Sequence, residues 1–266
     1  MNQSYLIGID IGTSACKVAL FDRSGCVLAA ANGDYPVYYP KEGWAEQNPE
    51  EWWSAVCGAV RQVIEEASVA PEEIAGVGID GQSWSAIAID RNGHVLTNTP
   101  IWMDTRAQSI CDRLNEEIGA EAIFEVAGNS LQPSYATAKI LWYKENLPEV
   151  YAKIDKILQS NSFIAFKLTG AVSQDLSQGY GLHCFDMRTG KWNEAMCEKL
   201  GIPVEFLPEI VPCDHVVGTV TKKAAEECGL AEGTPVVAGG LDAACGTLGA
   251  GVINPGETQE QGGQAG

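Results

Sequence analysis

The first 31 residues alternate between short apolar segments and polar turns, and this alternation constrains the fold more than any other part of the sequence. An apolar segment from Leu6 to Ile11 is interrupted at Gly12-Thr13-Ser14 and resumes at residues 18–21. It is interrupted again at residues 22–25, which read Asp-Arg-Ser-Gly, and resumes at residues 26–29. Short apolar segments bounded by Gly, Ser and Asp turns are typical of strands joined by hairpins. The chain is therefore predicted to begin with three hairpin-connected strands.

The first of these turns has the chemistry of a phosphate-binding site. Gly12 allows close approach of the backbone to an anion, and Thr13 and Ser14 can donate hydrogen bonds from their N–H and hydroxyl groups. Asp10, at the end of the first strand, is placed to hold a hydrated Mg²⁺ beside that anion. The turn therefore suggests nucleotide phosphate binding. Taken alone, the segment fits a hairpin with a polar tip equally well.

The charge of the chain argues against two classes of partner. Seventeen Lys and Arg residues stand against 35 Asp and Glu residues, which gives a formal net charge of −18. Nucleic acids and anionic membrane surfaces attract proteins through basic patches, so we expect neither as a partner. A local turn can still attract phosphate in an acidic protein, so the net charge says little about catalysis.

Cysteine content and hydropathy bear on the compartment. No two of the nine cysteines have C-x-x-C spacing, and most lie in apolar segments, for example Cys57, Cys111 and Cys245. This pattern favours reduced, buried thiols over a structural zinc site. The sequence shows neither a signal-peptide pattern nor a run of 18 apolar residues. We expect a soluble, cytoplasmic protein.

After the opening strands, helical and strand patterns alternate. Asn48 and Pro49 mark the start of a long amphipathic helix, with Glu51 as the acid of a capping box. The remaining patterns predict strands at residues 74–79, 86–89, 94–96 and 235–238, and helices near residues 105–118, 136–147, 148–154, 161–168 and 243–250. This order indicates an α/β fold with a mixed sheet and helices on both faces. Residues 256–266 are rich in Gly and Gln without a closing element, which we interpret as a chain cut where another unit begins.

Four motifs occur in one order along the chain: the hairpin Asp10–Lys17, Gly43-Trp44-Ala45-Glu46-Gln47, Trp102-Met103-Asp104-Thr105-Arg106 and Gly239-Gly240-Leu241-Asp242-Ala243-Ala244. Together they resemble the amino-terminal domain of the FGGY carbohydrate kinases, with xylulokinases as the most similar members. Residues 135–142 also resemble a signature of this family, although Ala136 replaces its usual Pro, Ser or Thr. The resemblance extends over essentially the whole chain.

The resemblance implies an architecture and a set of ligands. The fold is expected to be actin-like (ribonuclease H-like), and this chain would be the first of two such domains separated by a cleft. Residues 1–252 would form the sugar-binding and catalytic domain, and residues 253–266 would begin a truncated nucleotide-binding domain. ATP, Mg²⁺ and a small sugar are the implied ligands, and a homodimer is a further expectation. Without the second domain the isolated chain is expected to be inactive.

The same resemblance assigns roles at the phosphate side. Asp242 would be the general base that takes the proton of the sugar hydroxyl, while its alternative role is that of a helix N-cap. Gly239 and Gly240 would keep the backbone before it open to a ligand. Asp10 would hold Mg²⁺ through water, and Thr13 would contact ATP phosphate together with Gly12 and Ser14. A second phosphate loop would use Gly262 and Gly263, with Gln264 in place of a hydroxyl residue. Lys17 could help to neutralise phosphate, but a lysine on a strand is more often a solvated residue, so no role is assigned to it here.

The sugar pocket is expected to be built from amide, carboxylate and aromatic side chains, because a polyol presents hydroxyl groups and an apolar C–H face. The resemblance and the position after the strand at residues 74–79 favour Gln82, Ser83, Trp84, Asp104, Arg106 and Tyr135. Two alternatives stay open. Asp104 and Arg106 can simply form a salt bridge, and Trp102 and Trp142 can be structural.

The substrate is less constrained than the reaction. Ser83-Trp84 stands where xylulokinases usually have Met-His and glycerol kinases have Arg-Glu. Glycerol is therefore disfavoured, and a ketopentose such as D-xylulose is expected, with ribulose, gluconate or erythritol as alternatives. A second class of function is a non-catalytic actin-like ATPase or sugar-sensing module, which would hydrolyse ATP without regard to the sugar present.

Overall fold

A computed structural model of the chain describes residues 4–260. It opens with three antiparallel strands, β1 (Tyr5–Ile11), β2 (Ala15–Asp22) and β3 (Val27–Asp34), which confirms the predicted hairpins. In this register Asp10 of β1 lies opposite Lys17 of β2.

A parallel strand, β5 (Ile74–Gly81), completes the centre of the sheet on the other side of β1. The sheet has the order β13-β14-β5-β1-β2-β3. Strand β13 (Val216–Thr219) is antiparallel to β14 (Pro235–Val237), and β14 is parallel to β5. The short strand β15 (Gly240–Leu241) also pairs in parallel with β5. The predicted mixed sheet is therefore confirmed.

Helix α1 (Pro49–Ala67) starts where the sequence predicts. The Asn48 side chain accepts a hydrogen bond from the backbone N–H of Glu50, and Pro49 occupies the first turn. The capping-box role predicted for Glu51 is not the contact observed, because this carboxylate accepts a hydrogen bond from the Tyr38 hydroxyl at 2.7 Å. The buried face of α1, which includes Trp52, packs against β2 and β3.

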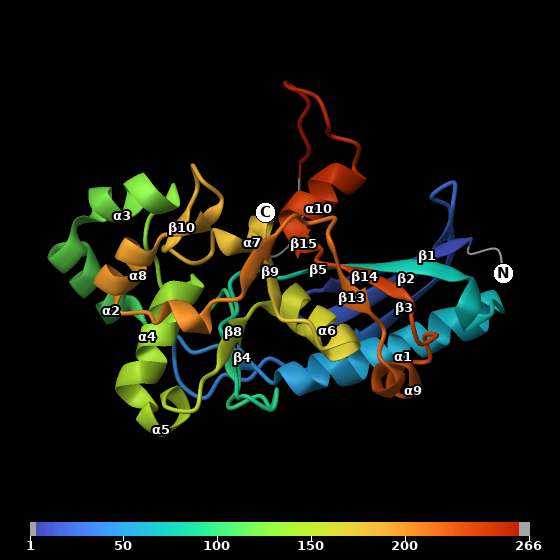
Figure 1. Cartoon of the computed structure of the whole chain (residues 1–266), viewed down its shortest axis with the longest axis horizontal. Helices are drawn as coiled ribbons and strands as arrows, with labels where there is room; N and C mark the ends of the chain where they lie inside the picture. Colours follow the sequence, from blue (N-terminus) through green and yellow to red (C-terminus); the bar gives the residue numbers. More distant parts are fainter. Residues whose placement is uncertain (1–3, 261–266) are drawn as a thin grey trace.

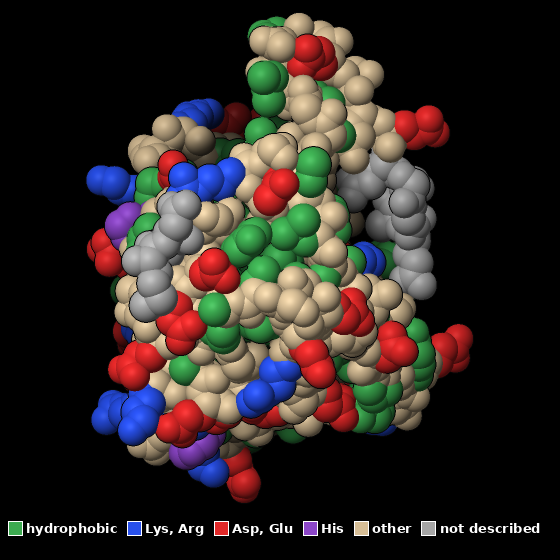
Figure 2. Space-filling model, turned by 90° about the vertical axis from the view of Figure 1, so that its right-hand side faces the viewer, with side chains coloured by type: hydrophobic (Ala, Val, Ile, Leu, Met, Phe, Trp, Pro, Cys, Tyr) green, Lys and Arg blue, Asp and Glu red, His purple; other side chains and the backbone are tan. Residues whose placement is uncertain are grey.

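Helices α1, α6 (Ser160–Thr169) and α9 (Lys222–Cys228) pack together against one face of the sheet, whereas α10 (Asp242–Gly249) lies over the other face (Figure 1). On the side shown in Figure 2, hydrophobic side chains gather below the projecting C-terminal segment, with acidic side chains around them. Leu6 of β1 and Val27 and Leu28 of β3 are exposed hydrophobic residues of the sheet. The second face is thus covered mainly at the end where α10 begins.

A helical lobe with its own hydrophobic core adjoins the sheet (Figure 1). Its helices are α2 (Gln108–Leu114), a π-helical turn (Asn115–Gly119), α3 (Ala120–Ala127), α4 (Ala136–Asn146), α5 (Pro148–Tyr151) and α8 (Glu194–Leu200). The shorter elements are β4 (Glu46–Gln47), η1 (Pro71–Glu73), β6 (Ile87–Ile89), β7 (Thr99–Pro100), β8 (Lys156–Leu158), β9 (Ser173–Asp175), α7 (Leu176–Gly179), β10 (Phe185–Asp186), β11 (Lys191–Trp192), η3 (Val204–Phe206) and β12 (Glu209–Val211).

The predicted helices near residues 136–147, 148–154, 161–168 and 243–250 are confirmed, whereas the single helix expected at 105–118 is α2 followed by the π-helical turn. The strand expected at residues 94–96 is reduced to one bridge between Ile89 and Val95. Helices α3, α8 and α9 were not predicted from the sequence. Across residues 4–260, every helix is too short or too polar to cross a membrane.

Candidate functional site

The turn between β1 and β2 is held in place from several directions. The Tyr35 hydroxyl donates to the Gly12 carbonyl at 2.6 Å, and the Gln47 amide donates to the Thr13 carbonyl at 2.8 Å. Trp102 Nε1 donates to Thr13 Oγ1 at 3.0 Å. The Thr13 hydroxyl accepts this hydrogen bond through a lone pair of its oxygen, which leaves its O–H as a donor for a ligand. Trp102 thus orients Thr13.

Glycine is required at position 12 by the turn itself. A Cβ atom there would lie 2.9 Å from the carbonyl oxygen of Ala15, and the Gly12 N–H donates to the same oxygen at 3.1 Å. Within this turn, the donors left for an anion come from Thr13 and from Ser14, whose side chain is exposed. In this structure Gly12 shapes the turn, and its own N–H is already used within the turn.

Asp10, at the base of this turn, is surrounded by charged groups from two neighbouring strands. Lys17 Nζ lies 2.7 Å from Asp10 Oδ2, so Lys17 belongs to the cluster and is not merely a solvated strand residue. On the other side, Asp80 of β5 lies in register with Asp10 and shares a hydrogen bond with it. Burial, followed by the charge of Asp10 and their hydrogen bond, raises the pKa of Asp80 to about 8. The sequence reasoning missed Asp80, although it ends a buried strand as Asp10 does.

Asp242 is the first residue of α10 and directly follows β15. The N-cap position belongs to Leu241, so Asp242 does not have the N-cap role considered as its alternative. Its Oδ1 accepts a hydrogen bond from the Ala243 N–H at 2.7 Å. Burial raises the pKa of Asp242, and the charge of Asp10 adds to this, whereas the Ala243 bond and Lys17 lower it. Asp10, Asp80 and Asp242 thus form an acidic cluster at the carboxyl ends of β1, β5 and β15.

The two glycines before Asp242 are required by the packing of the chain itself. A Cβ at Gly239, whose φ is +72°, would lie 1.7 Å from the carbonyl oxygen of Ile79. A Cβ at Gly240 would lie 2.8 Å from Ser177 Oγ. Close packing against β5 and Ser177 therefore requires both glycines, independently of any ligand. This packing brings Asp242 next to Asp80.

Gln82 does not emerge from the strand end as expected, because it is 1% exposed. Its backbone N–H still donates to the Ile11 carbonyl, so the β1–β5 pairing continues through it. Its side-chain Nε2 donates to the Gly12 carbonyl at 3.3 Å and to Gln47 Oε1 at 2.9 Å. Gln82 therefore locks the β1–β2 turn onto β5.

Trp84 and Tyr135 form a stacked pair with ring centroids 4.0 Å apart. Tyr180, which the sequence reasoning did not identify, meets Trp84 edge-on at 5.9 Å. Trp84 has a φ of +61°, and its N–H donates to Gln159 Oε1. A Cβ at position 181 would lie 2.4 Å from Trp84 Cδ1, so Gly181 leaves room for the ring. The half-buried Ser83 precedes this aromatic wall.

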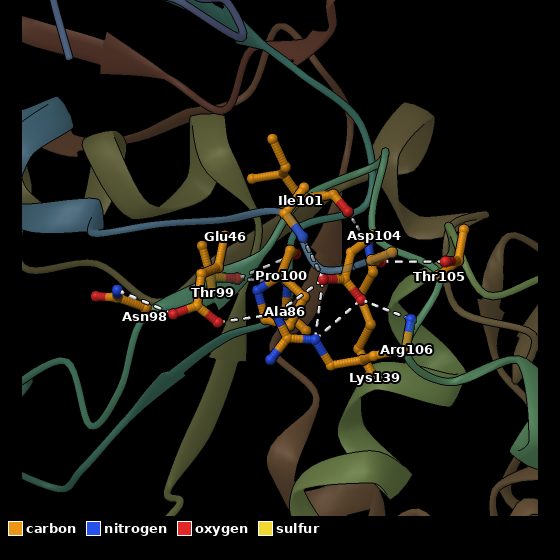
Figure 3. A network of polar contacts seen from close by, with 12 residues as sticks. Glu46, Ala86, Asn98, Thr99, Pro100, Ile101, Asp104, Thr105, Arg106 and Lys139 are labelled. Carbon is orange, nitrogen blue, oxygen red and sulfur yellow. Dashed lines mark hydrogen bonds and ion pairs between the residues drawn. The ribbon is translucent and has the colours of Figure 1, made fainter. Parts of the chain in front are cut away.

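Asp104 and Arg106 form the salt bridge that was the alternative to a sugar contact (Figure 3). Their side chains are 0% and 3% exposed. Arg106 Nε donates to both Asp104 oxygens, and the Ala45 N–H donates to Asp104 Oδ2 at 2.7 Å. Arg106 also pairs with Glu46 at 2.8 Å. Since the Asp104 oxygens are buried and occupied, this pair is suited to holding loops together rather than to contacting a ligand.

Tryptophan side chains flank the same salt bridge. The Arg106 guanidinium lies 3.8 Å from the ring centroid of Trp44 and 4.9 Å from that of Trp142. A cavity of about 360 Å³ opens beside them, lined in part by Lys41 and Asn98. The acidic cluster does not line this cavity, so the cavity is separate from it. Trp142 thus packs against the Arg106 guanidinium, whereas Trp102 supports the β1–β2 turn.

The donor set fits a hydrated magnesium ion. Within residues 4–260, no group of three or more His, Cys, Asp or Glu side chains is arranged to hold a metal ion. Mg²⁺ commonly keeps several waters and binds through one or two carboxylates plus substrate phosphates. Asp10, with Asp80 at its side, offers carboxylate oxygens of this kind at the turn. Gly262 and Gly263 lie outside the described residues.

Comparison with known proteins agrees with this geometry. Residues 5–249 match the model of the FGGY family of carbohydrate kinases, N-terminal domain. Xylulose kinase from Bacillus subtilis (strain 168) is 33% identical over 254 residues, covering 96% of this chain and 51% of that protein.

Solved structures give the same result. Xylulose kinase from Rhodospirillum rubrum superposes with a TM-score of 0.90 at 28% identity, covering 95% of this chain and 52% of the other. Gluconate kinase from Lactobacillus acidophilus has a TM-score of 0.87 at 27% identity, covering 94% and 50%. The actin-like fold expected from the sequence is therefore confirmed. The chain spans about half the length of the relatives it matches.

Proposed function

We propose, from the premise that this chain belongs to the FGGY family of carbohydrate kinases, that it binds a small sugar and provides the base for ATP-dependent phosphorylation. The observation that carries the proposal is the position of Asp242. A half-buried carboxylate begins a helix at the strand ends where Asp10 and the β1–β2 turn also lie. A base and a phosphate-binding turn are two of the parts that phosphoryl transfer to a hydroxyl requires, together with the metal ion.

Asp242 would accept the proton of the sugar hydroxyl. The hydroxyl oxygen would attack the γ-phosphorus of ATP, and ADP would leave. Burial raises the pKa of this carboxyl, which brings a general base closer to neutral pH. Positioned proton transfer of this kind contributes about 10²–10⁴-fold to the rate. Lys17, beside Asp10, adds a positive charge that moderates the repulsion among the acidic side chains.

The phosphate side would use the β1–β2 turn. Thr13, oriented by Trp102, would donate a hydrogen bond from its hydroxyl to a phosphate oxygen, and Ser14 would add further hydrogen-bond donors. Asp10 would hold Mg²⁺ through water, and the ion would supply charge neutralisation of the ATP phosphates. Gly262 and Gly263 would belong to a second phosphate loop. Gln82 would fix the turn through its Nε2, and its Oε1, which has no hydrogen-bond partner among the described residues, would accept a hydrogen bond from the sugar.

The sugar side would use the aromatic wall. The stacked rings of Trp84 and Tyr135, with Tyr180 at their edge, present an apolar surface for the C–H face of a sugar. Ser83 would contact a hydroxyl. Similarity to proteins named xylulose kinase supports a ketopentose such as D-xylulose, while similarity to one named gluconate kinase keeps an aldonate as the alternative.

Sugar binding and nucleotide binding would be assigned to different domains. Residues 1–252 would carry the sugar and the base, and residues 253–266 would lead into a nucleotide-binding domain. Closure of the cleft would exclude water and align the reactants. We therefore expect residues 1–266 alone to lack transfer activity.

The test is an assay of ADP release by the complete protein with Mg-ATP. The panel contains D-xylulose, L-xylulose, D-ribulose, L-ribulose, gluconate, erythritol and glycerol, with a reaction lacking sugar as the control. Release that depends on one sugar supports the proposal and identifies the substrate. ATP hydrolysis at the same rate with and without every sugar would instead support the non-catalytic module.

A further inference from the structure

A fully buried lysine connects the segments of the proposed sugar pocket. Lys139 of α4 is 0% exposed, and its side chain reaches into the interior (Figure 3). Its Nζ donates to the backbone carbonyl oxygens of Trp84 at 2.9 Å, Ile101 at 2.9 Å and Ser134 at 2.5 Å. An ammonium group has three N–H donors, so all three are used on these carbonyls.

The three carbonyls belong to segments that are far apart in the sequence and carry different parts of the site. Trp84 is itself one half of the stacked pair, and Ser134 directly precedes Tyr135, the other half. Ile101 directly precedes Trp102, whose ring nitrogen orients the Thr13 hydroxyl. One side chain therefore fixes the backbone beside the aromatic wall and beside the support of the phosphate turn.

Burying an ammonium group costs free energy unless its surroundings compensate. Burial lowers the pKa of Lys139 to about 7, and the nearby charge of Asp104 opposes that shift. A methionine or leucine would fill the same space without this cost, but neither could donate a hydrogen bond to a carbonyl group. A role that depends on the three hydrogen bonds accounts for the presence of lysine here.

We propose that Lys139 is a positioning residue, which holds the three carbonyls at fixed separations and thereby sets the geometry of the sugar pocket. This inference rests on the proposed function for the identity of the pocket. Lys139 itself touches no substrate in this arrangement. It acts through Trp84, Tyr135 and the segment that contains Trp102.

The test compares Lys139→Met and Lys139→Gln with wild type in the complete protein. Methionine removes all three donors at similar volume, and glutamine keeps two neutral N–H donors. Lys144→Met is the matched control, because Lys144 lies on the same helix and its exposed side chain donates to the Gly201 carbonyl at the surface. For each variant, the KM for sugar, the KM for ATP and kcat are measured with the sugar selected by the panel.

We expect Lys139→Met to raise the sugar KM about tenfold or more. A change of this size corresponds to the loss of about one hydrogen bond from a charged group. The ATP KM should rise less than the sugar KM, because Lys139 reaches the β1–β2 turn only indirectly, through Ile101 and Trp102. The values for Lys139→Gln should lie between those of wild type and Lys139→Met, and Lys144→Met should match wild type. A merely structural role would lower thermal stability and leave the sugar KM of the folded fraction unchanged. That result, or an equal rise in both KM values, would overturn the proposal.

Amide hydrogen exchange provides a readout that does not depend on activity. Lys139→Gln, or Lys139→Met if it folds, should exchange faster than wild type in residues 83–86, 101–105 and 130–135 together, while Lys144→Met should not. Faster exchange in only one segment, or in none, would refute the connection between the three. If wild type shows no sugar-dependent ADP release, the proposed function fails, whereas the exchange result still decides whether Lys139 holds the segments.

Discussion

The carboxyl groups of Asp10 and Asp80 lie side by side at the ends of two parallel strands and share a hydrogen bond. Two carboxyl groups can share a hydrogen bond only when one of them carries a proton. Burial and the charge of Asp10 account for this, since they raise the pKa of Asp80 to about 8. The end of the sheet that carries the proposed base therefore holds one carboxyl that keeps its proton near neutral pH.

The first prediction concerns the pH dependence of stability in metal-free buffer. Because the folded state holds the Asp80 proton more tightly than the unfolded state, this group's contribution is present at low pH. It is lost as the pH rises from about 4, the ordinary value, towards 8. Asp80→Asn should remove that loss. The Tm of the variant minus the Tm of wild type should therefore be larger at pH 8 than at pH 5.

Thermal unfolding of both proteins with EDTA at several pH values measures this difference. About 1 kcal/mol corresponds to about 2–4 °C in a chain of this size, so a shift of several degrees is expected. Glu257→Gln is a suitable control, because Glu257 is exposed and its pKa is lowered by hydrogen bonds from Asn254. Parallel pH curves for wild type and Asp80→Asn would show that the two carboxyls are not coupled.

The second prediction concerns the proposed base. Asp242→Asn keeps the size of the side chain and its acceptor oxygen for the Ala243 N–H, but it cannot take a proton. We expect kcat to fall by about 10²–10⁴-fold with little change in the sugar KM. Steady-state kinetics of the complete protein measure both constants. Near-wild-type kcat in Asp242→Asn would exclude this residue as the base.

The third prediction concerns the aromatic wall. Trp84→Ala removes the ring that we propose contacts the C–H face of the sugar, and we take this contact to contribute as much as a stacked aromatic pair, about 0.5–1.5 kcal/mol. The sugar KM should rise by about 2- to 10-fold, with the ATP KM unchanged. Trp192→Ala, which removes a ring from the pair with Phe185, serves as the control. An unchanged sugar KM in Trp84→Ala would rule out stacking of the sugar on this ring.

The fourth prediction separates a scaffold role from a binding role for Arg106. Arg106→Ala leaves Asp104 buried without its cation, and breaking a buried ion pair in this way costs about 3–5 kcal/mol. Chemical denaturation should show a loss of this size. Arg188→Ala, which breaks an exposed pair with Glu125, should change stability by about 1 kcal/mol or less. Full stability of Arg106→Ala together with a large rise in sugar KM would indicate a ligand contact instead.

Local sequence signals predicted the elements that are defined locally. The β1–β2 and β2–β3 hairpins follow from turn residues between apolar segments, and the start of α1 follows from Asn48 and Pro49. Helices α3, α8 and α9 were not predicted, although two of them carry local signals. Helix α8 begins at a side-chain cap from Asn193 and ends at Gly201, and α9 begins at a cap from Thr221 and ends at Gly229.

The candidate site was predicted unevenly for a related reason. Asp10, Thr13 and Asp242 could be chosen because each lies at a turn or strand end that the sequence itself marks. Gln82 was placed wrongly, because whether a side chain at a strand end faces solvent or the neighbouring turn depends on what packs there. Tyr180 had no local signal, and Lys139 lies in the signature-like stretch at residues 135–142 without any sign of its role, since the significance of both lies in contacts with distant segments.

The sequence by itself determined the family, the order of strands and helices in the first part of the sheet, and the residue types available for phosphoryl chemistry. Turn residues, helix caps and apolar spacing act over a few neighbouring positions, so they can be interpreted without a fold. Only the tertiary structure decided that Asp80 lies beside Asp10, that Asp104 is saturated by Arg106, and that Lys139 joins three loops. These relationships depend on strand register and on which polar groups must find partners once water is excluded, and both arise only when distant segments pack together.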